Sequence, residues 1–136
     1  MRGVTGEELL QRPVRLRGIQ LGRPVDVLLH PREPHALGLD VLCGDERHRF
    51  LPASAAKVHS DQVEVTSPLV LLDLREDSFY RLRTRSLSAL RGTRVGDEGE
   101  LEDIVLGPGW RIVELVLEGG DRVPMDGLVL PGGRSR

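Results

Sequence analysis

The segment Pro24-Val25-Asp26-Val27-Leu28-Leu29 and the segment Glu102-Asp103-Ile104-Val105-Leu106 share one pattern, an aspartate followed by aliphatic residues. Successive side chains of an extended strand point to opposite faces, and aliphatic and β-branched residues favour strands. In the first segment this places Val25, Val27 and Leu29 on one face. Each segment is therefore predicted to be a strand that carries one aspartate among core side chains.

The residues around these two segments also recur in the same order, which indicates an internal repeat. The two aspartates are 77 residues apart, the flanking matches before them are 81 apart, and those after them are 76 and then 72 apart. This steady decrease is expected if the second copy has shorter loops. The matched residues are Val14 with Val95, Gly18 with Gly99, Asp26 with Asp103, Val27 with Ile104, Leu29 with Leu106, Leu39 with Leu115, Val41 with Leu117, and Leu51-Pro52 with Val123-Pro124.

Many short Val and Leu runs separated by Gly and Pro predict an all-β fold. Each copy begins with one short helical turn, at 5–10 and at 86–90, the first with a capping-box pattern from Thr5 to Glu8. The run Leu69-Val70-Leu71-Leu72 is predicted to be the last strand of the first copy. Closure into small barrels is expected because it removes exposed sheet edges. The predicted organisation is a first domain at 1–72, a charged connector at 73–85 and a shortened second domain at 86–136, packed as a pseudo-two-fold unit.

Composition limits the classes of function. The chain has 136 residues, a formal net charge of −2 and one cysteine, Cys43, so an internal disulfide framework is excluded. A dedicated nucleic-acid binder would need a local basic patch at this net charge. The sequence contains no apolar run long enough to cross a bilayer, and a cytoplasmic location is expected.

Both copies resemble the PRC-barrel family, small β-barrels of the photosynthetic reaction centre H chain and of the C-terminal part of the ribosome-maturation factor RimM. The residues that carry the resemblance are 9–14, 21–29 and 50–52 in the first copy, and 90–95, 99–106 and 122–124 in the second. The family resemblance implies protein contact, because these barrels dock a ribosomal protein or cap a membrane complex. It therefore predicts a non-catalytic docking or adaptor module, as a monomer or a homodimer, with peripheral association with a membrane complex left open.

Enzyme motifs and metal-ligand spacings are not found in the sequence. There is no nucleophile elbow, phosphate loop or dinucleotide fingerprint, so we expect neither catalysis nor a cofactor. His30, His35, Cys43 and His48 follow no common zinc spacing. Asp26 and Asp103 are predicted to be structural carboxylates that accept hydrogen bonds, since a lone carboxylate without a partner base is no active site.

The connector carries the residues most suited to partner contact. Its arginines stand beside two aromatic residues, and guanidinium groups bind carboxylates and phosphates through paired N–H donors. The predicted partner-binding residues are Arg75, Phe79, Tyr80, Arg81, Arg83 and Arg85. A protein partner is the first interpretation. A role in ribosome assembly or RNA metabolism, with Tyr80 stacking on a base, is the alternative, and a solubilising linker is a third.

Overall fold

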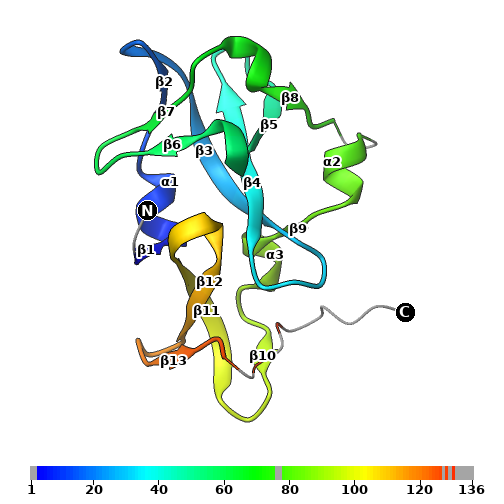
Figure 1. Ribbon diagram of the computed structural model, residues 1–136. Helices are drawn as coiled ribbons and strands as arrows, with labels where there is room; N and C mark the ends of the chain where they lie inside the picture. The colour runs from blue at the N-terminus through cyan, green and yellow to red at the C-terminus, as the bar shows by residue number, and fades with distance from the viewer. Residues whose placement is uncertain (1–2, 76–77, 127, 129, 131–136) are drawn as a thin grey trace.

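The computed structural model describes residues 3–75, 78–126, 128 and 130 of the chain. Its described part is mostly β, with short helices and two sheets, one of eight strands and one of five (Figure 1). No helix among these residues is long and apolar enough to cross a membrane.

The larger sheet has the strand order β6-β7-β2-β3-β4-β5-β8, with β9 pairing with β3. All its pairs are antiparallel except the parallel pair of β2 with β7. Its strands are β2 (Val14–Leu16), β3 (Ile19–Leu29), β4 (Ala36–Cys43), β5 (His48–Pro52), β6 (Lys57–Val58), β7 (Val63–Glu64), β8 (Leu72–Asp73) and β9 (Arg85–Ser86).

The smaller sheet is antiparallel and has the order β1-β11-β12-β13, with β10 pairing with β11. Its strands are β1 (Val4–Thr5), β10 (Arg94–Val95), β11 (Gly99–Leu106), β12 (Ile112–Leu117) and β13 (Arg122–Pro124). The α-helices are α1 (Gly6–Leu10), α2 (Phe79–Leu82) and α3 (Leu87–Leu90), and 3-10 turns occupy Ala53–Ala55, Pro68–Val70 and Pro108–Trp110.

Both predicted helical turns are confirmed, and each begins at a side-chain cap. At α1 the Thr5 hydroxyl accepts a hydrogen bond from the Glu8 N–H, and the Glu8 carboxylate accepts one from the Thr5 N–H, which completes the predicted capping box. At α3 the Ser86 hydroxyl accepts from the Ala89 N–H. These bonds satisfy N–H groups that the first turn of a helix leaves unpaired.

The expected barrel closure is not found. Over the described ranges the larger sheet ends at β6 and β8, and the smaller sheet ends at β1 and β13. The end strands β6 and β8 have two residues each, too few to pair extensively with each other. The predicted strand 69–72 is also wrong in its first part, because Pro68 and the Ser67 side chain, which accepts from the Leu69 N–H, start a 3-10 turn there.

Each sheet includes a strand from the other half of the sequence (Figure 1). β1 pairs with β11 in the smaller sheet, and β9 pairs with β3 in the larger one. The helix that follows each of these strands, α1 or α3, therefore begins beside a strand of the other half. The exchange is reciprocal, because the first strand of each half pairs in the sheet of the other half.

The matched residues of the two copies have matched partners in the sheets. Val27 of β3 pairs with Leu39 of β4, and Ile104 of β11 pairs with Leu115 of β12. The next pairings follow the same relation: Leu39 with Leu51, and Leu115 with Val123. The spacings of 77, 76 and 72 residues seen in the sequence thus relate residues in the same sheet positions.

One matched pair, Gly18 with Gly99, is wrong. Val14 pairs with Gly22, whereas Val95 pairs with Gly99, so Gly99 takes the position of Gly22. The two hairpins have turns of different kinds. Residues 17 and 18 form a two-residue turn in which both φ angles are positive, 51° and 83°, whereas three residues separate β10 from β11.

Two apolar clusters lie on opposite faces of β3. Val27 and Leu29 belong to the main core, which contains side chains from both sheets. Leu28 points to the other face and packs in a smaller cluster with Phe50 and Leu74. This smaller cluster supports α2, because Tyr80 packs against it. The cluster therefore holds the connector helix against the larger sheet.

Candidate functional site

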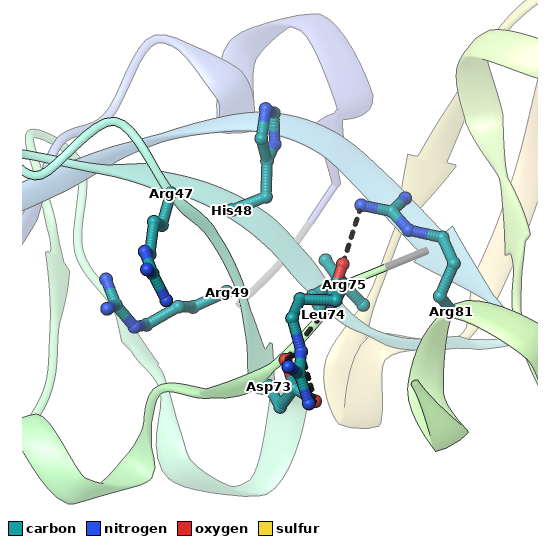
Figure 2. Close-up of a pocket in the computed structure, with 7 residues that line it drawn as sticks. All are labelled: Arg47, His48, Arg49, Asp73, Leu74, Arg75 and Arg81. Carbon is teal, nitrogen blue, oxygen red and sulfur yellow. Dashed lines mark hydrogen bonds and ion pairs between the residues drawn. The ribbon is translucent and has the colours of Figure 1, made fainter. Parts of the chain in front are cut away.

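A pocket of about 700 Å³ lies beside the β5–β8 pair and helix α2 (Figure 2). Its lining is unusually rich in arginine and comes from three stretches that are far apart in the sequence. We call it the arginine pocket, and its lining residues are Arg47, His48, Arg49, Asp73, Leu74, Arg75 and Arg81.

The β5–β8 pairing sets one wall of the arginine pocket. Arg49 and Asp73 are register partners in these strands. The Arg49 guanidinium donates two hydrogen bonds to the Asp45 carboxylate, at 3.0 and 2.7 Å. This pairing lowers the pKa of Asp45 to about 2 and raises that of Arg49. Because the pKa of Asp45 is depressed, its contribution to stability is lost only in strong acid, and the pair keeps its charge near neutral pH.

A second arginine–carboxylate pair lies at the end of β8. Arg75 Nε donates to Asp73 Oδ1 at 3.0 Å, and its terminal nitrogen donates to Oδ2 at 3.1 Å. These hydrogen bonds, together with the nearby charge of Arg47, lower the pKa of Asp73. Arg47 itself is exposed and makes no side-chain hydrogen bond or ion pair with any described residue.

Asp40 contacts two further residues that line the arginine pocket, His48 and Arg81. Its side chain is only 7% exposed, although it is a carboxylate on β4. Oδ1 contacts His48 Nδ1 at 2.8 Å, and Oδ2 accepts a hydrogen bond from Arg81 at 3.3 Å. Arg81 also donates to the carbonyl oxygen of Leu74 at 3.3 Å (Figure 2). One buried carboxylate thus fixes a histidine from β5 and an arginine from α2.

The arginine pocket carries a net positive charge. Its four guanidinium groups meet three carboxylates, those of Asp40, Asp45 and Asp73, so one positive charge remains with His48 neutral. Guanidinium groups present rigid pairs of N–H donors that match planar or tetrahedral oxyanions. The arrangement is therefore suited to bind an anionic group.

Aromatic packing holds α2 against the sheet. The Tyr80 and Phe50 rings stack with centroids 4.4 Å apart, and the Phe79 ring meets Tyr80 edge-on. The Arg83 guanidinium lies 4.9 Å from the centroid of the Phe79 ring. One face of each connector ring is thus occupied within the protein.

The structure separates the six predicted partner-binding residues. Arg75 and Arg81 line the arginine pocket, and Phe79, Tyr80 and Arg83 lie on or next to α2. Arg85 lies elsewhere, on β9, where it donates to the Pro31 carbonyl oxygen at 2.8 Å and burial lowers its pKa. Five of the six predicted residues therefore lie at the arginine pocket or on or next to α2, and Arg85 does not.

The two predicted structural carboxylates occupy equivalent places. Asp103 accepts hydrogen bonds from the N–H of Ile104 at 2.7 Å and of Glu7, in the first turn of α1, at 3.0 Å. Asp26 accepts from the N–H of Val27 at 2.9 Å and of Ser88, in α3, at 3.1 Å. Each aspartate therefore binds the helix that belongs to the other half of the sequence.

A histidine pair in the β3–β4 loop forms a different cluster from the one considered in the sequence. Donor atoms of His30, Glu33 and His35 lie within 4.8 Å of one another, whereas Cys43 and His48 are not part of this group. His30 Nδ1 accepts hydrogen bonds from the N–H groups of Arg32 and Glu33, at 3.0 and 2.9 Å. A neutral His30 ring therefore carries its proton on Nε2, and a metal there would require this turn to open.

Sequence reasoning missed the pocket-lining residues Arg47, His48, Arg49, Asp73 and Leu74. It also missed Asp40, which contacts His48 and Arg81. The approach of residues 47–49 to the connector depends on the β5–β8 pairing, which joins segments far apart in the sequence. A usable signal was Asp40 itself. Strand alternation puts it on the face opposite to Leu39 and Val41, where a carboxylate on a buried strand needs a cationic or hydrogen-bonding partner.

Comparison with known proteins does not add a family. No protein-family model matches the chain, and no curated protein matches it.

Proposed function

We propose that the chain is a non-catalytic docking module of the PRC-barrel type that binds an anionic segment of a partner protein in the arginine pocket. Its proposed architecture is two diverged repeats related by a pseudo-two-fold axis. The reciprocal pairing of β1 with β11 and of β9 with β3 supports this architecture. The equivalent hydrogen bonds of Asp26 and Asp103 also support it.

The observation that carries the docking proposal is the excess of guanidinium groups in one pocket. Arg47 faces solvent and makes no side-chain hydrogen bond or ion pair with a described residue, although its charge acts on nearby Asp73. It can therefore bind an anion without breaking a hydrogen-bonded pair. Arg81 is fixed by Asp40 and the Leu74 carbonyl, which limits the side-chain entropy lost on binding. The pocket thus combines one accessible cation with positioned neighbours.

The surroundings favour a protein partner over RNA. Exposed Phe79 and Leu82, at 62% and 69%, lie on the same short helix as Arg81 and offer apolar contacts to a peptide. Single-stranded RNA is usually bound by stacking bases on free aromatic faces. Here Tyr80 already stacks on Phe50, and Arg83 covers one face of Phe79.

The first test measures binding of a short fluorescein-labelled peptide of Glu, Leu and Gly by fluorescence polarisation, at low and at physiological salt. We expect the acidic peptide to bind and its Lys-substituted counterpart not to bind. Arg47→Ala should weaken binding by about fivefold, the effect of losing one exposed charge contact of about 1 kcal/mol. Higher salt should weaken it further.

The matched control is Arg94→Ala, which removes the same charge from an exposed position on β10. Equal losses in the Arg47 and Arg94 variants would indicate attraction to net charge and would contradict a docking pocket. A single-stranded RNA of similar length that binds more tightly than the peptide, with loss in Arg47→Ala, would favour the RNA alternative instead. Absence of binding to every anionic peptide tested, phosphorylated or not, would refute the proposal.

A further inference from the structure

Most guanidinium groups of the arginine pocket are already paired with carboxylates of the same chain. Arg49 is held by Asp45, Arg75 by Asp73 and Arg81 by Asp40. A carboxylate from a partner has the same charge and the same two oxygens as these internal ligands. The internal ligands also have the advantage of high effective concentration, because they are tethered. A partner's carboxylate therefore gains little by exchange and has mainly Arg47 to bind.

A phosphate monoester differs from a carboxylate in both respects that matter here. It carries a charge of about −1.5 to −2 at neutral pH and presents three acceptor oxygens. It can therefore bind Arg47 and share N–H donors of neighbouring guanidinium groups without displacing their carboxylates completely. Arginine clusters recognise phosphorylated side chains in this manner in general.

From this competition we propose that the group recognised in the arginine pocket is the phosphate monoester of a phosphorylated serine or threonine in the partner. This inference rests on the proposed docking function. A phosphodiester, as in RNA, has a single charge and two unesterified oxygens. Like a carboxylate, it therefore gains little by competing with the internal carboxylates for the paired arginines. Phe79 and Leu82, exposed on the helix that carries Arg81, favour a peptide as the source over a free phosphate.

The experiment compares three versions of the acidic peptide, with Glu, Ser or phosphoserine at one central position, on the full chain at pH 7.5. Binding is followed by fluorescence polarisation and by the Nε–Hε resonances of the arginines in NMR spectra. We expect the phosphoserine peptide to bind at least tenfold more tightly than the Glu peptide. Binding of the phosphoserine peptide should shift the Arg47 and Arg81 resonances. The tenfold advantage over the Glu peptide should be lost in Arg47→Ala and kept in Arg94→Ala.

The outcomes separate this inference from the function on which it rests. If the Glu peptide binds in the pocket but phosphoserine improves binding by less than about threefold, the monoester inference is overturned and docking stands. If none of the three peptides binds, the docking function itself fails. Inorganic phosphate and dimethyl phosphate are the remaining probes. If inorganic phosphate binds as tightly as the phosphopeptide, the inference that a peptide supplies the phosphate is overturned. If dimethyl phosphate binds as tightly as inorganic phosphate, the preference for a monoester is overturned.

Discussion

Replacing Asp103 by alanine is expected to lower the free energy of unfolding by about 3 kcal/mol. The carboxylate is buried and accepts hydrogen bonds from the N–H groups of Ile104 and Glu7. Leaving a buried donor such as the Ile104 N–H without its acceptor costs about 1–3 kcal/mol, and the half-buried Glu7 N–H adds less. The substitution also removes an anion from the N-terminus of α1 and a distant partner of Arg91, 3.9 Å away.

The matched control is Asp26→Ala at the equivalent position of the first copy. Asp26 also accepts two backbone hydrogen bonds, from Val27 and Ser88, but it is only partly buried. Water can replace the lost carboxylate there, so a cost of about 1 kcal/mol is expected. The two carboxylates also differ in side-chain contacts, since the Ser88 hydroxyl donates to Asp26 at 2.5 Å and Arg91 lies 3.9 Å from Asp103. The difference between the two variants therefore reports burial together with these contacts.

Urea unfolding checks this prediction, with fluorescence of Trp110 and far-ultraviolet circular dichroism as two probes. Trp110 is the only tryptophan and is buried at 8% exposure, so its emission reports loss of the core. Asp103→Asn is a useful second variant, because it keeps the shape and one acceptor oxygen and should cost less than alanine. Equal stability of Asp103→Ala and Asp26→Ala would contradict the argument from burial.

Local patterns were sufficient to predict most elements. The alternation around Asp26 and Asp103 predicted β3 and β11, and the capping-box residues Thr5 and Glu8 predicted the start of α1. The predicted face of Val25 is wrong, because a register shift between Pro24 and Asp26 leaves Val25 exposed whereas Val27 and Leu29 are buried. These predictions depend on side-chain periodicity and on contacts between residues close in sequence. The repeat offsets predicted which residues share equivalent sheet positions, because both copies preserve the same strand pairing apart from the glycine at the first turn.

Long-range pairing was beyond the sequence patterns. Val4 and Thr5 are too few to reveal that they pair with β11 rather than with their own half, and Arg85–Ser86 poses the same problem with β3. Barrel closure was expected because it removes exposed sheet edges, but the short end strands β6 and β8 do not pair. The arginine pocket also arises from such contacts, since Arg81 meets Asp40 across 41 residues. Sequence order therefore indicated the connector but not its carboxylate and arginine neighbours.

A methyl group at position 38 is expected to destabilise the protein by about 3 kcal/mol or more. Gly38 lies in β4, and a Cβ atom there would overlap the Leu51 carbonyl oxygen and lie 2.8 and 2.9 Å from carbons of the Phe50 ring. Overpacking of a filled core typically costs about 1–3 kcal/mol. Here one overlapping atom belongs to the backbone of the paired strand, so β4 and β5 must separate.

Gly44→Ala is the matched control. Gly44 lies in the β4–β5 turn, its added Cβ would meet nothing within 4 Å, and its φ is not in the left-handed region. Its stability should change by less than about 1 kcal/mol, in the favourable direction if the turn accepts alanine without strain. Urea unfolding of the two variants compares the same chemical change at a crowded and at an open position. Equal urea midpoints for the two variants would contradict the prediction and would show that β4 and β5 can move apart at little cost in stability.

The consequence of Gly38→Ala for the arginine pocket follows from Phe50. The ring that a new methyl group would push is the ring on which Tyr80 stacks, and Tyr80 precedes Arg81 in α2. Displacement of Phe50 should loosen α2 and weaken the contact of Arg81 with Asp40. Under conditions in which Gly38→Ala is still folded, we expect weaker binding of the acidic peptide than in Gly44→Ala. Unchanged peptide binding in the folded Gly38→Ala protein would show that the pocket does not depend on this aromatic support.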